Sequence, residues 1–251
     1  MTERDVDIAV SSDHLLGRRL TLWQPRDGYR AAIDPVLLAA AVPARAGDQV
    51  LDLGCGVGTA GLCLAVRVAG VRVSGLDLQG DLIKLALRNA AANDLATRVQ
   101  FQCGDILDFR AAGFDHVLVN PPYLARGSAS VSPNPIKAAA NVEGKAGLSD
   151  WVNCAIEAVK PGGSVTFIHR ADRGDELCAL LARGLGDLAR LDLLPRDDAA
   201  AKRVIVQGIK GSADPMHGRR NWVLHQSDGR FTAKTEAVLR DVAAMAIRTD
   251  P

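Results

Sequence analysis

From residue 48 onward, apolar runs typical of strands alternate along the chain with segments typical of helices. We expect strands at 49–53, 71–77, 99–103, 114–119, 163–169, 188–194 and 203–209, and helices at 59–69, 81–93, 147–159 and 172–183. Strands that alternate with helices predict a parallel sheet covered on both faces. A charged turn joins the last two strands and suits an antiparallel hairpin. The pattern therefore predicts an α/β fold with a doubly wound, mostly parallel sheet of seven strands, the last of them antiparallel.

A shorter N-terminal part precedes this alternation. We expect residues 1–46 to form an extension with a short strand and a helix, and residues 47–251 to form the main domain. The first dozen residues look irregular, residues 20–23 read as the strand, and Asp34 is expected to cap a helix with Pro35 in its first turn. Residues 124–146 and 211–221 are expected to be loops, and the first is long enough to serve as a lid or a substrate-contacting loop.

Composition excludes several classes of protein. Hydrophobic residues make up 48% of the 251 residues and charged residues 24%, as in an ordinary globular enzyme. No apolar run approaches the ~20 residues of a membrane span, and the N-terminus lacks the pattern of a signal peptide. The five cysteines form no Cys-x-x-Cys pair, which favours reduced cytoplasmic thiols over a disulfide framework or a metal site. We therefore expect a cytoplasmic protein that binds neither membrane nor metal.

The segment Asn120-Pro121-Pro122-Tyr123 follows the fourth expected strand directly. Two consecutive prolines fit neither a helix interior nor a sheet ladder, so the backbone must leave the strand abruptly here. The turn presents a side-chain amide, the Pro121 carbonyl and an aromatic ring at a strand end. These groups offer two acceptors and a flat apolar face, which together suit a planar amino group. A plain Pro-Pro turn with a buried tyrosine is the alternative for these four residues taken alone.

A glycine-rich turn, Asp52 to Gly58, ends the first strand of the main domain. Its glycines are spaced Gly-x-Gly-x-Gly, whereas nicotinamide-binding turns are spaced Gly-x-Gly-x-x-Gly. A carboxylate just before the first glycine disfavours a pyrophosphate and favours a ligand with an ammonium group. S-adenosylmethionine carries such a group. The residues assigned to the cofactor here are Asp52, Gly54, Cys55, Gly56 and Gly58.

Carboxylates also end the next two strands. Asp77 is placed to accept the ribose hydroxyls of an adenosine, with a helix cap as the competing role. Asp105 is placed to accept the adenine amino group, with a simple cap as the alternative role. Leu78 and Ile106 are assigned to the same ligand, as is Asn120. The carboxyl ends of parallel strands meet at one edge of the sheet, where such folds bind ligands.

Two segments are locally basic, at 18–30 and 202–230. Each is an ordinary solvated surface or a patch that binds RNA phosphates. The candidate RNA-binding residues are Arg26, Arg30, Lys202, Arg203, Arg219 and Arg220.

The span 48–170 resembles the class I, Rossmann-like methyltransferases that use S-adenosylmethionine. The turn at 52–58 resembles their cofactor loop, Asp77 their ribose acid and Asp105 their adenine acid. Residues 120–123 resemble the catalytic motif of the members that methylate adenine, cytosine or glutamine amino groups. Segments 24–30, 34–38, 168–173 and 228–232 resemble the bacterial tRNA(Val) adenine-37 N6-methyltransferase family, so the resemblance covers about residues 20–245.

The resemblance implies direct methyl transfer to an exocyclic amine. Asn120 and the carbonyl of Pro121 would accept hydrogen bonds from the two N–H groups of the amine. Pro122 would fix the turn, and Tyr123 would stack on the base. The implied substrate is adenine N6 in a tRNA or another structured RNA. Two alternatives remain open: methylation of a glutamine amide in a translation factor, and a cofactor-binding RNA module without turnover. The oligomeric state does not follow from the sequence.

Overall fold

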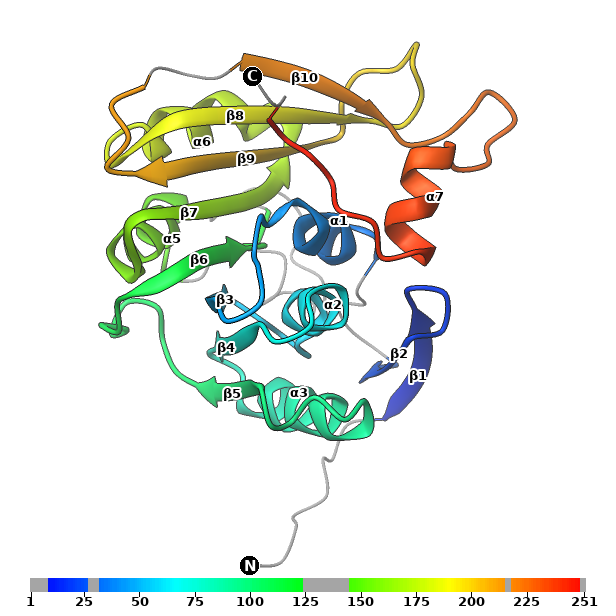
Figure 1. Ribbon diagram of the computed structural model, residues 1–251, viewed down its shortest axis with the longest axis vertical. Helices are drawn as coiled ribbons and strands as arrows, with labels where there is room; N and C mark the ends of the chain where they lie inside the picture. Colours follow the sequence, from blue (N-terminus) through cyan, green and yellow to red (C-terminus); the bar gives the residue numbers. More distant parts are fainter. Residues whose placement is uncertain (1–8, 27–31, 124–144, 215–217, 249–251) are drawn as a thin grey trace, which may run out of the picture.

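The computed structural model describes residues 9–26, 32–123, 145–214 and 218–248. Its centre is an eight-stranded sheet in the order β10-β8-β9-β7-β6-β3-β4-β5 (Figure 1). The strands are β3 (Gln49–Leu53), β4 (Arg72–Asp77), β5 (Val99–Cys103), β6 (Phe114–Val119), β7 (Val159–Arg170), β8 (Leu185–Leu194), β9 (Arg203–Lys210) and β10 (Gly218–Val223). Every neighbouring pair is parallel except the two pairs that contain β9.

The central strands are buried on both faces, because helices cover the sheet from both sides. In β6, Val117, Leu118 and Val119 are all fully buried, so the strand reads as a continuous apolar run instead of an alternating one. In the registers of β3, Leu53 lies opposite Leu76 of β4 and opposite Val119 of β6. These strands therefore end side by side, and the segments that follow them meet at one edge of the sheet.

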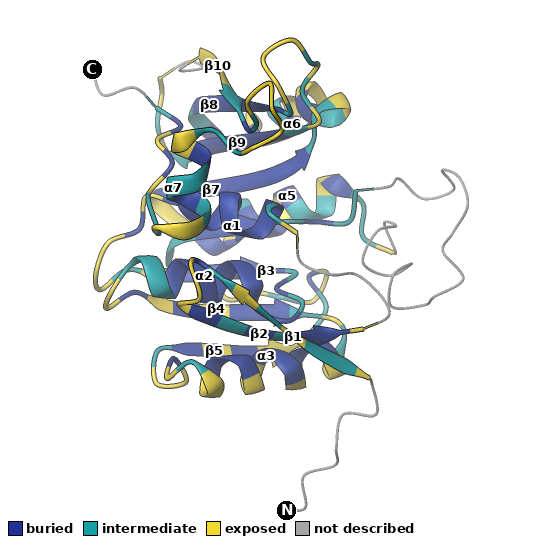
Figure 2. Ribbon diagram, turned by 90° about the vertical axis from the view of Figure 1, so that its right-hand side faces the viewer, coloured by how far each residue is buried: buried dark blue, intermediate teal, exposed yellow. Residues whose placement is uncertain are grey.

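Two groups of helices cover the two faces. One apolar core is shared by α1 (Asp34–Ala41), α2 (Thr59–Arg67) and α3 (Gly80–Ala92). A second core contains α5 (Leu148–Ala158) and α6 (Gly174–Leu181). The short helix η1 (Ala171–Arg173) precedes α6. Helix α3 is amphipathic, with Leu82, Leu85 and Ala86 buried and Asp81 and Lys84 exposed (Figure 2). The helices thus bury an apolar stripe and leave a polar face outside.

A separate hairpin of β1 (Val10–Leu15) and β2 (Leu20–Pro25) docks on α3. The buried side chain of Asn89 accepts a hydrogen bond from the Trp23 N–H at 2.7 Å and donates one to the Trp23 carbonyl at 2.9 Å. Asn93, one turn later, bonds the backbone of Thr21 in the same way. The two amides take the place of a neighbouring strand and satisfy part of an exposed strand edge.

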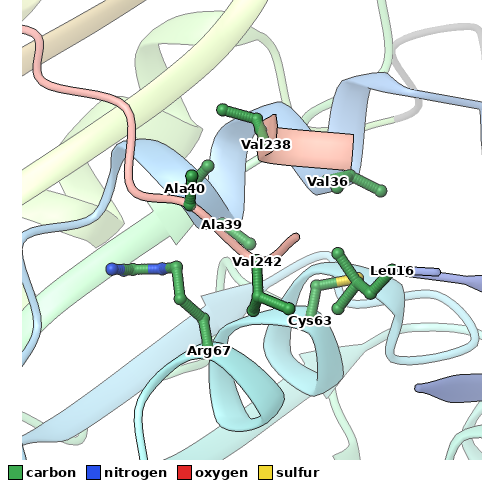
Figure 3. Close-up of a pocket in the computed structure, with 9 residues that line it drawn as sticks. Leu16, Val36, Ala39, Ala40, Cys63, Arg67, Val238 and Val242 are labelled. Atoms are coloured by element: carbon green, nitrogen blue, oxygen red, sulfur yellow. The ribbon is translucent and has the colours of Figure 1, made fainter. Parts of the chain in front are cut away.

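The C-terminal part of the described chain packs on α1. Helix α7 (Ala233–Arg240) is followed by an extended segment in which the Met245 N–H bonds the Ala40 carbonyl at 2.8 Å. Between α1, α2 and α7 lies a small cavity lined mostly by apolar side chains (Figure 3). Its charged member, Arg67, donates to the Val42 carbonyl, and burial lowers the pKa of its guanidinium. The residues that line this cavity include none of the candidate site residues.

The predicted α/β sheet is confirmed, and its strand count is wrong. All seven expected strands form, and β9 is the antiparallel one. The eighth strand, β10, arises in the segment 211–221 that was expected to be a loop. Residues 10–12, expected to be irregular, belong to β1. The division at residue 46 stays a prediction, and no helix in the described ranges is long and apolar enough to cross a membrane.

Candidate active site

The glycine-rich turn between β3 and α2 is fixed to the neighbouring strand by its backbone. The N–H groups of Gly54 and Cys55 both donate to the Leu76 carbonyl, at 2.8 and 3.0 Å. The N–H of Gly58 then closes the turn on the Cys55 carbonyl at 2.8 Å. The backbone of the turn is therefore anchored to the end of β4.

The three glycines of this turn have positive φ angles, and their surroundings differ. A Cβ on Gly54 would lie 2.8 Å from the Trp151 ring, and one on Gly58 would lie 2.5 Å from the Phe101 ring. A Cβ on Gly56 would meet nothing within 4 Å. Gly54 and Gly58 are thus needed for packing, whereas Gly56 borders open space at the sheet edge, as a residue facing a ligand would.

Asp52 is a buried carboxylate beneath this turn. One of its oxygens accepts the Gly61 N–H at 2.8 Å, which ties β3 to the first turn of α2. Burial raises the pKa of Asp52 to about 7; the Gly61 hydrogen bond lowers it and the charge of Asp77 raises it. A cation brought near Asp52 would stabilise its charged form.

Asp77 holds the turn from the end of β4. Its two carboxylate oxygens accept the N–H groups of Gly56 and Gln79, each at 2.9 Å, and burial raises its pKa. The residue at the N-cap of α3 is Gln79, so the competing role of a helix cap does not apply to Asp77 itself. Asp77 positions the glycine turn, and its role toward a ribose stays a prediction.

The third strand end combines a polar and an apolar part. Asp105 accepts the Leu107 N–H at 3.0 Å, which folds the chain into a short turn. The side chain of Ile106 is buried in the core, whereas Leu78 is 66% exposed. An apolar side chain exposed beside Asp77 is suited to a flat apolar ligand.

The Asn120–Tyr123 turn is held from two other parts of the chain. The Tyr123 hydroxyl lies 2.7 Å from Oδ1 of Asn120 and 2.8 Å from Oδ2 of Asp34. Arg203 donates from Nε to the same Asp34 oxygen at 2.8 Å, and its guanidinium lies 4.6 Å from the centre of the Tyr123 ring. Pro121 is buried and Pro122 half-buried.

Asp34 and Arg203 have roles at this site that the sequence reasoning missed. Asp34 was expected to cap a helix, but the N-cap of α1 is Ile33, and the Asp34 carboxylate points to Tyr123 instead. Arg203 was predicted to bind RNA, whereas in the structure its guanidinium bonds the Asp34 carboxylate. A signal existed in the resemblance of segment 34–38 to a methyltransferase family, but nothing in the sequence connects this segment to residue 123.

His169, at the end of β7, lies beside Tyr123. Its ring packs edge-on against Tyr123 with the ring centres 5.3 Å apart, and it is fully buried. Within the described part of the chain neither ring nitrogen has a hydrogen-bond partner. Burial first, and then the charge of Arg173, lowers the pKa of His169 to about 4, so its ring is neutral at pH 7.

The remaining basic candidates are spread over the molecule. Arg26 bonds the Val10 carbonyl at 3.0 Å at the end of the hairpin, Lys202 is exposed next to Arg203, and Arg30 lies outside the described residues. Arg219 and Arg220 lie on β10, the far edge strand of the sheet. Arg219 forms an ion pair with Asp192, which also binds Arg190 at 2.9 Å.

Comparison with known proteins identifies this arrangement. A family model described as the methyltransferase small domain matches residues 32–176, more than half of the chain. The chain belongs to this family. The match runs from the segment before Asp34, through the glycine turn and the Asn120–Tyr123 turn, into α6. The prediction of a methyltransferase is thereby confirmed.

Named relatives agree with this membership, and a solved structure shares the fold. The tRNA1(Val) (adenine(37)-N6)-methyltransferase of Tolumonas auensis is 28% identical over 162 residues, 64% of this chain and 68% of the relative. The protein of the same name from Actinobacillus succinogenes is 25% identical over 228 residues, 89% of this chain and 94% of the relative. The crystal structure of a predicted O-methyltransferase from Agrobacterium tumefaciens superposes with a TM-score of 0.71 at 24% identity, over 85% of this methyltransferase and 98% of that chain, which shows the shared fold.

Proposed function

We propose that this methyltransferase transfers a methyl group from S-adenosylmethionine to the exocyclic N6 nitrogen of adenine in a tRNA. The observation that carries the proposal is the Asn120–Tyr123 turn, held at the end of β6 directly beside the glycine turn of β3. The relatives named for adenine-N6 methylation of tRNA support the choice of acceptor. A cytoplasmic location, expected from the reduced cysteines, accords with this substrate.

The residues at the sheet edge fit the proposed cofactor. Asp52 is a buried carboxyl group whose charged form an ammonium group would stabilise, and Gly56 borders open space next to Asp77. Asp77 is assigned to the ribose and the exposed side chain of Leu78, with Asp105, to the adenine. When bound, S-adenosylmethionine supplies the electrophilic methyl group.

The chain itself supplies positioning and hydrogen bonds. The amine of adenine is a weak nucleophile because its lone pair is delocalised into the ring. In the proposed mechanism the side-chain oxygen of Asn120 and the Pro121 carbonyl accept hydrogen bonds from the two N–H groups of the amine, which favours a tetrahedral nitrogen. Tyr123 packs against the base. The proton leaves after methyl transfer, so the mechanism needs no strong base. His169 is neutral and fully buried at this site, so we assign it packing against Tyr123.

The test is methylation of total tRNA by the purified protein with methyl-labelled cofactor, followed by nucleoside mass spectrometry. We expect label in N6-methyladenosine. Label in protein with unlabelled RNA would favour the glutamine-amide alternative, and label in neither, with the cofactor bound, would favour a binding module.

The matched variant for this test is Asn120→Ala. Asn120 is one of several residues assigned to the cofactor, and the others remain in this variant, so we expect cofactor affinity, measured by calorimetry, within about twofold of the wild type. We expect methylation to fall by at least about a hundredfold, the loss typical of a removed transition-state hydrogen bond. A variant that keeps most of the activity would remove Asn120 from the mechanism.

A further inference from the structure

The hydroxyl of Tyr123 lies between two oxygen atoms. It is 2.8 Å from Oδ2 of Asp34 and 2.7 Å from Oδ1 of Asn120. A phenol has one hydrogen, so it can donate to only one of these oxygens at a time. The choice between them determines the hydrogen bonding of the amide that the proposed mechanism uses.

Asp34 is the stronger acceptor of the two. It is 9% exposed, and it forms an ion pair with Arg203, whose Nε donates to the same oxygen at 2.8 Å. Hydrogen bonds to an ionised acceptor are roughly twice as strong as bonds between neutral groups. The Tyr123 hydrogen therefore points to Asp34, and the phenol oxygen presents its lone pairs to Asn120.

An amide oxygen at 2.7 Å from that phenol oxygen, with no hydrogen between them, would be repelled. A half turn of the Asn120 amide exchanges Oδ1 and Nδ2, two atoms of nearly the same shape. In that orientation Nδ2 donates to Tyr123, Tyr123 donates to Asp34, and every contact in the chain of bonds has one hydrogen. Oδ1 then lies on the side of the amide that faces away from the Tyr123 hydroxyl.

We propose that Asp34 is a positioning residue that acts through the Tyr123 hydroxyl to orient the Asn120 amide with its oxygen toward the acceptor amine. This rests on the proposed function, because an amine needs an oxygen, and not a second N–H group, as its partner. The arrangement joins α1, the turn after β6 and the start of β9. Arg203 holds both the carboxylate and the Tyr123 ring.

The test is a double-mutant cycle with Asp34→Asn, Tyr123→Phe and the combined variant. In Asp34→Asn, the new amide can donate to the phenol oxygen, which then donates to Oδ1 of Asn120 and occupies it. We expect each single change to lower the single-turnover methylation rate at least tenfold, with cofactor affinity in calorimetry within about twofold of the wild type. Because both changes break the same chain of bonds, the combined variant should be no slower than the slower single variant.

Two results would overturn the role of Asp34. They are rate losses that multiply in the combined variant, and an Asp34→Asn protein that keeps more than half of the wild-type rate. If Asp34→Asn does not fold, Tyr123→Phe decides alone, because it removes only the hydroxyl; a wild-type rate would then refute the chain of bonds. The matched control is Asp187→Asn, which breaks another part-buried Asp–Arg pair, with Arg248, and should leave the rate unchanged.

The test of Asp34 can be distinguished from the test of the proposed adenine acceptor. The wild-type protein is first assayed on tRNA and on protein acceptors. If it methylates a glutamine amide, adenine is the wrong acceptor, and the same cycle is measured on that amide. Both acceptors carry an NH2 group, so non-additive losses there would still support the role of Asp34, and multiplicative losses would refute it.

Discussion

Asp52 is a buried carboxyl group, and the proposed function assigns it to the ammonium group of the cofactor. Because its pKa of about 7 lies above the ordinary 3.8, the folded protein holds this proton more tightly than the unfolded chain does. The stability that the proton contributes is present in full below about pH 4 and is lost as the pH rises to about 7. A bound ammonium reverses this preference, since it favours the carboxylate.

Cofactor binding should therefore release a proton. Near pH 7 about half of the Asp52 side chains are protonated, so we expect release of about half a proton there and an affinity that increases between about pH 6 and 8. Calorimetry in two buffers of different ionisation enthalpy measures this number. Asp52→Asn should bind the cofactor without the release. Equal release from that variant would assign the proton to another group, with Asp77, whose pKa burial also raises, as the next candidate.

At the scale of the element, the turn between β3 and α2 combines glycines that serve different purposes. Gly54 and Gly58 make room for aromatic rings of the core, whereas Gly56 faces open space next to Asp77. All three have positive φ, where a side chain is strained by about 1–2 kcal/mol. Alanine substitutions at different glycines can therefore separate the effects of backbone strain, core packing and ligand contact.

Alanine at Gly58 should lower stability much more than alanine at Gly56, because only the former forces a Cβ to 2.5 Å from Phe101. Gly56→Ala should lower the free energy of unfolding by about 1–2 kcal/mol, from strain alone, and reduce cofactor affinity at least tenfold. Gly47→Ala is the control, since its φ is +93° and its Cβ would also meet nothing. Urea unfolding and calorimetry measure the two effects. Unchanged cofactor affinity in Gly56→Ala would place the ligand elsewhere.

The elements that the sequence predicted are those with a core pattern. Strands β3 to β9 carry buried apolar residues, in continuous runs or, as in β5, in alternation with exposed ones, and their positions were predicted within a few residues at most ends. Strand β10 was missed because Gly218 to Asn221 are all exposed, so its pairing with β8 left no apolar alternation. The contact of Asp34 with Tyr123 was missed for another reason: the residues are 89 positions apart, and the sequence showed only a polar residue before a proline.

At the scale of the whole molecule, the carboxyl edge of the sheet collects the polar groups, whereas the candidate RNA-binding residues are spread over the molecule and only some of them lie at that edge. Lys202 lies beside Arg203 at that edge, whereas Arg220 lies on β10. Strand β10 is four strands from β6 in the sheet (Figure 1). At roughly 4.8 Å between neighbouring strands, this separation is about 19 Å. A net charge of +1 gives no general attraction for RNA. Binding must then depend on a few local cations, each with its own share of the salt dependence.

Lys202→Ala and Arg220→Ala should each weaken tRNA binding and reduce the slope of log affinity against log salt by about 0.7–0.9, the share of one phosphate contact. Arg219 is unsuitable for this test, because its removal would leave the buried Asp192 with less compensating charge. Arg72→Ala, exposed at the amino end of β4 on the opposite edge of the sheet, is the matched control and should change neither affinity nor slope. Filter binding at several salt concentrations measures both quantities. If the slope changes in Lys202→Ala and not in Arg220→Ala, the RNA contacts the carboxyl edge of the sheet and does not reach β10. If Arg72→Ala changes the slope equally, neither Lys202 nor Arg220 belongs to a specific RNA interface.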